Sequence, residues 1–175
     1  MRQPALFISF AAWRSIMKIL IISDTHGRLE NLYRVLEIEK PVDNLLHLGD
    51  FSRDQDEIRA AAECACAFVR GNCDWCCDER DTRDFGLFDH RIHMEHGHML
   101  PDSFAGIAAK AAGLGADIIM YGHTHMPLVH RQNGVYIVNP GSLSKPRQSD
   151  RRPSYIIMTI EDGQEPEFEI RYLSD

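Results

Sequence analysis

Two histidines stand one residue apart in the segment YGHTHMPLVH, which covers residues 121–130. They follow an apolar run, and four other short polar groups follow apolar runs elsewhere in the chain. Each group contains or adjoins a glycine, which is typical of a turn. Imidazole, carboxylate and amide oxygen form a ligand set suited to Mn, Fe, Ni or Zn rather than Ca. The groups are Asp24-Thr25-His26, Gly49-Asp50, Gly71-Asn72, His96-Gly97-His98 and Gly122-His123-Thr124-His125.

These groups offer more ligands than one catalytic ion with an open coordination position would use. One carboxylate that bridges two ions about 3.5–4 Å apart would use them all, and such a pair clamps the oxygens of a phosphoryl group. Turn formation and capping are the alternative roles for these residue types, but this many in one order favour a metal site. The candidate ligands are Asp24, His26, Asp50, Asn72, His96, His123 and His125.

Apolar runs of two kinds must position these ligands. Short continuous runs predict buried strands, and runs with a period near 3.6 predict helices. Because each ligand group follows a strand, the strand ends should bring distant segments to one edge of the sheet. The predicted strands are 18–22, 44–48, 66–70 and 117–121, the helices are 29–39, 53–65 and 103–114, and a hairpin over 84–95 turns about Asp89 and His90.

The C-terminal part of the chain is predicted to contain strands alone, over residues 135–138, 154–160 and 167–172. Turn signals stand at Asn133-Gly134 and Asp162-Gly163. Alternating strands and helices followed by consecutive strands indicate an α/β fold in which two mixed sheets pack face to face between helices, a four-layer αββα sandwich.

Composition limits the classes of protein to which the chain can belong. With 175 residues, 44% of them hydrophobic, the chain is long enough for one core and too short for two ordinary domains. The formal charge of −7 disfavours stable binding of nucleic acid, and no apolar run is long enough for a membrane span. Residues 1–16 are predicted to be an N-terminal extension, with a signal peptide as the alternative, before a single domain over 17–175. Five cysteines with an isolated CxxC favour free thiols and a cytoplasmic location.

The ordered series D-x-H, G-D, G-N, H-G-H and G-H-T-H resembles the calcineurin-like metallophosphoesterases. The short chain and the form GNCD, in place of GNHE, resemble the small YfcE-type phosphodiesterases, and the resemblance covers residues 17–173. It implies two divalent ions, for which we expect Mn, with Fe, Ni or Zn as alternatives. Asp24, His26 and His125 would hold one ion and Asn72, His96 and His123 the other. Asp50 would bridge the two ions.

The implied reaction is hydrolysis of a phosphodiester by in-line attack of a hydroxide that bridges the two ions. Asp50 and Asn72 serve this reaction as ligands, and His98 is the candidate for contact with the phosphate. Cys73 stands where GNHE enzymes keep a histidine proposed as general acid, and its side chain is expected to point into packing beside Asn72. His47 is expected to be a hydrogen-bonded strand residue rather than a ligand.

Two other functions remain as alternatives. One is a phosphomonoesterase or nucleotide phosphatase of the same fold, and the other is a non-catalytic scaffold that resembles a retromer subunit. The scaffold predicts lost imidazoles, whereas all of them are present here. With only short insertions to cap a substrate, chiefly 76–86, we expect an open site with few specificity elements. The expected partner is a small phosphodiester substrate, and a homo-oligomer is left open.

Overall fold

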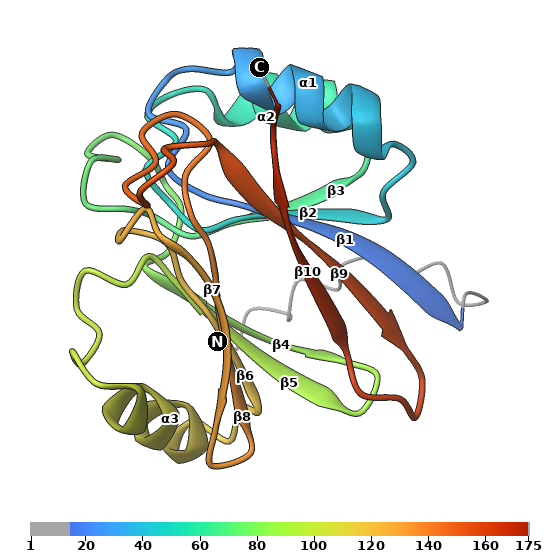
Figure 1. The fold of residues 1–175 in the computed structure, drawn as a ribbon, viewed down its shortest axis with the longest axis vertical. Coiled ribbons are helices and arrows are strands. Elements are labelled where there is room, and N and C mark those ends of the chain that lie inside the picture. Colours follow the sequence, from blue (N-terminus) through green and yellow to red (C-terminus); the bar gives the residue numbers. More distant parts are fainter. Residues whose placement is uncertain (1–14, 175) are drawn as a thin grey trace, which may run out of the picture.

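The computed structural model describes residues 15–174, which form two five-stranded sheets packed face to face. The first sheet has the order β10-β9-β1-β2-β3, and the second has the order β4-β5-β6-β8-β7. Figure 1 shows α1 and α2 over the outer face of the first sheet and α3 against the outer face of the second. The predicted four-layer αββα sandwich is therefore confirmed. The elements are β1 (Ile16–Ile22), α1 (Glu30–Glu39), β2 (Asn44–His47), α2 (Gln55–Ala62), β3 (Ala65–Phe68), β4 (Thr82–Leu87), β5 (His90–Glu95), α3 (Phe104–Gly113), β6 (Ile118–Met120), β7 (Pro127–Gln132), β8 (Val135–Pro140), β9 (Ser154–Glu161) and β10 (Glu167–Tyr172).

Strand β1 is apolar on both faces because it is covered on both sides. Ile19 and Ile21 pack between the two sheets, whereas Leu20 and Ile22 pack beneath the helices of the outer layer. Strands β1, β2 and β3 run parallel, and β9 pairs antiparallel with β1. A strand buried on both faces reads as a continuous apolar run, which explains the sequence KILII.

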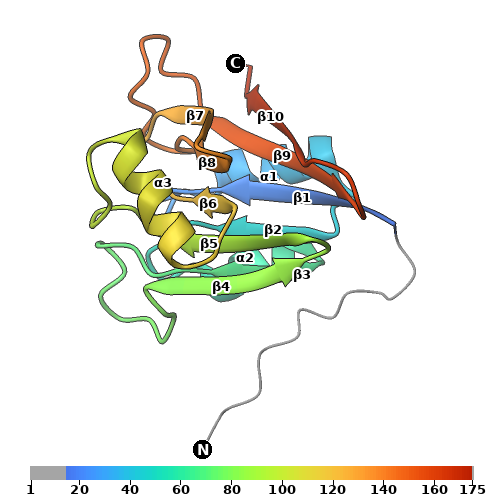
Figure 2. The ribbon, with the colours of Figure 1, turned by 90° about the horizontal axis from the view of Figure 1, so that it is seen from below.

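Among the described helices, α3 is the one that covers the outer face of the second sheet. Ile107 and Ala111 of α3 pack against Ile119 of β6 and Ile137 of β8, while Met120 points between the sheets. Strands β5, β6 and β8 are parallel neighbours. In Figure 2, the carboxyl ends of β5 and β6 lie on the same side of the molecule as those of β1 and β2.

Three features of the fold differ from the sequence prediction. Strand β7 was not predicted, because the sequence PLVHRQ forms a half-buried edge strand without a clear apolar alternation. Helix α2 ends three residues before the predicted end, since Glu63 adopts a left-handed conformation with φ of 55°. The β4–β5 hairpin turns at Phe88 and Asp89, so that His90 is the first residue of β5.

The N-terminal extension predicted over 1–16 lies mostly outside the described residues. Within them, β1 begins at Ile16, which pairs with Glu161 of β9. Among the helices of residues 15–174, none has the length and apolar character needed to cross a membrane.

Candidate metal centre

The candidate ligands lie at the carboxyl ends of five strands. Asp24, Asp50 and Asn72 follow β1, β2 and β3 of the first sheet, and His96 and His123 follow β5 and β6 of the second. Backbone hydrogen bonds join the loops: the Asp24 N–H donates to the Gly49 carbonyl at 3.0 Å, and the His26 N–H donates to the Asp50 carbonyl at 2.8 Å. The two sheets together therefore build one site.

One group of ligands gathers around a carboxylate oxygen of Asp24. This Oδ1 atom lies 3.0 Å from Nε2 of His125 and 3.7 Å from Nε2 of His26. The two imidazole nitrogens are themselves 3.4 Å apart. Such a cluster of one oxygen and two nitrogens can hold a metal ion.

A second group gathers around His96. Its Nε2 lies 3.1 Å from Oδ1 of Asn72 and 3.5 Å from Oδ1 of Asp50, and its ring centroid lies 5.2 Å from that of His123. The other carboxylate oxygen of Asp50, Oδ2, lies 3.9 Å from Nε2 of His26 in the first group. Asp50 thus has one oxygen directed to each group.

Backbone carbonyls fix which imidazole nitrogen faces the centre. Nδ1 of His96 is 2.7 Å from the Leu48 carbonyl, and Nδ1 of His125 is 2.6 Å from the Lys145 carbonyl. Since a carbonyl only accepts, each Nδ1 carries a hydrogen, and each Nε2 is the nitrogen directed into the centre. This outer contact is typical of histidines that bind metals.

The environment of Asp24 fits a bound cation. Its Oδ2 accepts a hydrogen bond from the His123 N–H at 3.0 Å, whereas Oδ1 is buried and has no hydrogen-bond partner within residues 15–174. A buried carboxylate oxygen without a donor is costly. A cation between Asp24, His26 and His125 would remove that cost, so the residues present suit a metal ion.

The charges around the centre also suit a cation. Burial would raise the pKa of Asp50, but hydrogen bonding and attraction to His96, with the backbone N–H of Cys73, outweigh it and hold the pKa well below its usual range. Burial lowers the pKa of His26 and of His123. At neutral pH the carboxylate of Asp50 is therefore ionised, and the imidazoles of His26 and His123 are neutral and able to bind a metal.

Several ligands adopt a backbone conformation that L-residues rarely use. In the GHTH loop, His123 and His125 have φ of 62° and 59°. Asp24, His26 and Asp50 have φ of 56°, 47° and 56°. Five of the seven candidate ligands are therefore in the left-handed region, where non-glycine residues are uncommon.

Two glycines allow the loops to approach the carboxylates. A Cβ added to Gly71 would lie 2.1 Å from Oδ1 of Asp50 and 2.3 Å from the Asp50 backbone nitrogen. At Gly122 it would lie 1.9 Å from Oγ of Ser23 and 2.8 Å from Oδ2 of Asp24. Any side chain at either position would displace a candidate ligand.

Asp74 organises the loops, a role that the sequence prediction missed. This buried carboxylate accepts three backbone hydrogen bonds: from Asp50 at 2.7 Å, from Gly71 at 2.8 Å and from Ser52 at 2.7 Å. It therefore joins the loop after β2 to the loop after β3. The sequence feature that could have indicated this role is the position of Asp74 in the motif GNCD, two residues after Asn72. His47, as predicted, is a hydrogen-bonded strand residue, with Nδ1 accepting from the Gly49 N–H at 3.2 Å.

The prediction for the Cys73 side chain is confirmed only in part. Its Sγ lies beside Asn72, whose Nδ2 donates to it at 3.4 Å, but the residue is exposed rather than packed. Sγ also lies within 4.8 Å of a ring nitrogen of His26 and a carboxylate oxygen of Asp50, so the thiol borders the centre. Burial, followed by the hydrogen bond and negative charge of Asp50, raises the pKa of Cys73 to about 11. The thiol is accordingly protonated at neutral pH. His98 is exposed, with its ring centroid 5.7 Å from that of His96.

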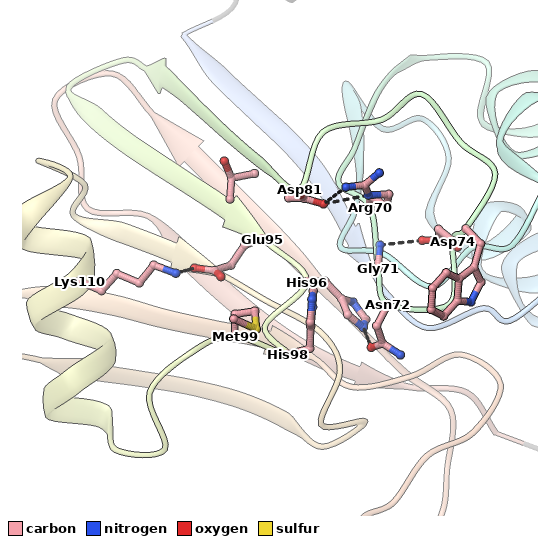
Figure 3. Close-up of a pocket in the computed structure, with 12 residues that line it drawn as sticks. Arg70, Gly71, Asn72, Asp74, Asp81, Glu95, His96, His98, Met99 and Lys110 are labelled. Atoms are coloured by element: carbon pink, nitrogen blue, oxygen red, sulfur yellow. Dashed lines mark hydrogen bonds and ion pairs between the residues drawn. The ribbon is translucent and has the colours of Figure 1, made fainter.

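A cavity of about 580 Å³ adjoins the centre. The sequence predicts an open site with few specificity elements, whereas this cavity offers side chains that a substrate could contact. Figure 3 shows the Glu95–Lys110 ion pair on one side of His98 and the loop with Asn72 and Asp74 on the other. The cavity is lined by Arg70, Gly71, Asn72, Asp74, Trp75, Asp81, Thr82, Glu95, His96, His98, Met99 and Lys110.

A chain of charged groups, in which His93 and Glu95 are buried, supports the wall of this cavity. Nδ1 of His93 lies 2.8 Å from Asp84, its Nε2 lies 3.1 Å from Oε1 of Glu95, and Nζ of Lys110 lies 2.5 Å from the same oxygen. Burial lowers the pKa of His93, but the hydrogen bonds to Glu95 and Asp84 outweigh it and raise the pKa above 6.5. His93 is therefore predominantly charged at slightly acidic pH.

Replacing His93 with glutamine should destabilise the protein most at pH 6. A histidine whose pKa is raised in the folded state stabilises that state below its unfolded pKa, and the contribution disappears as the pH rises through the folded pKa. A hydrogen bond to a charged group is worth about 1.5–3 kcal/mol, which sets the expected loss at pH 6. Urea unfolding of the parent and His93→Gln at several pH values between 6 and 9 measures it. A difference between the two proteins that does not shrink with rising pH would contradict this assignment.

The chain is similar in sequence and in fold to known phosphoesterases. The family model described as calcineurin-like phosphoesterase superfamily domain matches residues 17–163. The probable metallophosphoesterase YsnB of Bacillus subtilis is 36% identical over 83% of this chain and 86% of its own length. Phosphodiesterase YfcE of Escherichia coli K12 is 27% identical over 75% of this chain and 82% of its own, and a solved structure of the E. coli phosphoesterase Yfce has a TM-score of 0.65 over 81% of this chain and 87% of that one. Vacuolar Protein Sorting 29 from Cryptosporidium parvum has a TM-score of 0.73 over 93% of this chain and 100% of its own, but at 18% identity it shows the fold alone.

Proposed function

The chain belongs to the calcineurin-like phosphoesterase superfamily, and from that membership we propose that it hydrolyses phosphodiesters with two divalent cations bound at the strand ends. The single observation that carries the proposal is the position of Asp50, whose two carboxylate oxygens are directed to the two ligand groups. One group contains Asp24, His26 and His125, and the other contains Asn72, His96 and His123.

The cations would neutralise phosphoryl oxygens as Lewis acids and would lower the pKa of a water that serves as nucleophile. Imidazole and carboxylate donors suit Mn, which we favour, as well as Fe, Ni and Zn. Asp50 contributes the negative charge between the two positions, and the Cys73 N–H, which donates to Oδ1 of Asp50 at 2.8 Å, fixes that carboxylate.

His98 is the group we assign to the phosphoryl oxygens. It is exposed, lines the cavity, and its ring centroid lies 6.2 Å from that of His123. An imidazole on this side can donate a hydrogen bond to an equatorial oxygen as negative charge develops there. The thiol of Cys73, a weak donor, gives little help to a basic leaving group, so esters with acidic leaving groups should react fastest.

Hydrolysis of bis-p-nitrophenyl phosphate should exceed that of p-nitrophenyl phosphate by at least about tenfold in kcat/KM. The two substrates share a leaving group, but only the diester has a second ester group that can bind in the cavity and contribute binding energy. Steady-state rates with Mn²⁺ present test this expectation. A preference for the monoester would favour the phosphomonoesterase alternative instead.

The scaffold alternative has less support. A scaffold does not need its metal ligands, whereas this chain retains all seven candidates and gathers them at one place. The likeness to Vacuolar Protein Sorting 29 concerns the fold, which serves both kinds of protein. Hydrolysis of any phosphodiester that depends on added cations would decide for the enzyme.

A further inference from the structure

We propose that the cavity beside the metal centre binds the nucleoside of a mononucleotide diester, with the base stacked on Trp75. This inference rests on the proposed phosphodiesterase function. The cavity shares Asn72, His96 and His98 with the centre, so a substrate whose phosphate lies at the centre has one ester group beside the cavity. The volume of about 580 Å³ is within the range of cavities that hold small organic ligands.

Trp75 provides an aromatic surface at this cavity. Its side chain is 88% exposed, the most exposed of the large hydrophobic residues among those described. Exposure of an indole costs hydrophobic free energy that a planar ligand would recover by stacking. Stacking of a base on an aromatic side chain is worth about 1–3 kcal/mol. Met99, which is also exposed and lines the cavity, adds apolar surface.

The charges of the cavity wall favour an uncharged ester group. Nε of Arg70 lies 2.8 Å from Asp81, and Nζ of Lys110 lies 2.5 Å from Glu95, so each cation is next to an anion. The carboxylate of Asp74 accepts three backbone hydrogen bonds. A polyphosphate or a quaternary ammonium group would therefore meet a compensated surface rather than an opposite charge.

Polar donors remain for the edge of a base or for a sugar hydroxyl. An ammonium group has three N–H donors, and Lys110 directs one of them to Glu95. The hydroxyl of Thr82 lines the same cavity. The net charge of −7 opposes a long polyanion, so we assign a mononucleotide rather than a nucleic acid. The cavity therefore suits a flat, neutral group with polar edges, and a nucleoside is such a group.

The test compares two diesters that share charge and leaving group, thymidine 5′-(p-nitrophenyl phosphate) and ethyl p-nitrophenyl phosphate, with Mn²⁺ present. Trp75→Ala should raise the KM for the thymidine ester about tenfold and leave its kcat unchanged, because stacking acts on binding. The same variant should keep kcat/KM for the ethyl ester within about twofold of the parent. Trp75→Phe should restore most of the affinity. Ile38→Ala, which removes an exposed apolar side chain outside the cavity, is the matched control. It should leave KM and kcat unchanged for both substrates.

Binding of thymidine 5′-phosphate gives a readout that does not require turnover. Titration should quench the tryptophan fluorescence of the parent in a saturable manner, and the quenching should be lost in Trp75→Phe, which keeps Trp13. An unchanged KM in Trp75→Ala, or an equal loss on both esters, would overturn the proposal. Faster hydrolysis of p-nitrophenyl phosphorylcholine than of the thymidine ester would also overturn it, in favour of a cationic group. If no diester is hydrolysed, the proposed phosphodiesterase function fails, and the titration still decides whether the cavity binds a nucleotide.

Discussion

Replacing Asp50 with asparagine is expected to lower turnover of bis-p-nitrophenyl phosphate by roughly 10³-fold. Loss of a group that only positions a metal ligand typically costs 10–100-fold, and Asp50 has one oxygen directed to each ligand group. Asparagine tolerates the left-handed backbone at this position and keeps an oxygen for the Cys73 N–H, so the fold should survive. The change isolates the loss of negative charge between the two proposed cation positions.

Elemental analysis of the Mn²⁺-reconstituted proteins accompanies the rate measurement. The parent should hold close to two cations per chain, and Asp50→Asn should hold one or none. Asp89→Asn is the control, because it removes an exposed carboxylate in the β4–β5 turn, outside the metal centre and its cavity. A parent with only one cation, or a variant that keeps both, would refute the two-cation proposal.

Replacing Gly71 with alanine should lower activity by roughly 10²-fold although no ligand is removed. The added Cβ would lie 2.1 Å from Oδ1 of Asp50 and 2.3 Å from its backbone nitrogen, so the loop itself must shift. Overpacking of this kind also costs about 1–3 kcal/mol of stability. Both effects arise from the close approach of the loops after β2 and β3.

Gly113→Ala provides the matched control for this change. Apart from its chain neighbours and the backbone of its own helix, no atom of the described residues lies within 4 Å of a Cβ added at Gly113, which is the last residue of α3. Alanine has the higher helix propensity, so this variant should be as stable as the parent or more stable by up to about 1 kcal/mol. Steady-state kinetics and urea unfolding of both variants measure the difference. Parental activity in Gly71→Ala would show that the loop approach is not needed for Asp50 to act.

The sequence predicted the sheets and the convergence of the ligand groups because both depend on local patterns. The run KILII can be read as a strand covered on both faces, and the polar residues that follow it can only lie at the strand end. Strand β7 escaped prediction since its half-buried sequence lacks a period. Its pairing with β8 is a tertiary effect.

The contacts that the sequence did not reveal are those between distant segments. The role of Asp74 depends on the loop after β2, 22 to 24 residues away along the chain. The cavity forms where the loop with Trp75 meets Lys110 of α3 and Glu95 of β5. The direction of the Cys73 thiol depends on the path of the loop that carries it. Sequence patterns identify the residues in such cases but do not give their orientation.

The left-handed backbone at five candidate ligands means that the metal centre is preorganised by the scaffold. Each such residue costs about 1 kcal/mol or more relative to its preferred conformation, and the paired strands maintain it through contacts that involve no cation. The conformational entropy of these loops is lost when the chain folds rather than when a cation arrives. We infer that metal uptake is a binding event on a folded protein, unlike that of a zinc finger, whose folding depends on its metal. The centre therefore follows from the architecture, and a change of metal would alter the chemistry while the scaffold stays the same.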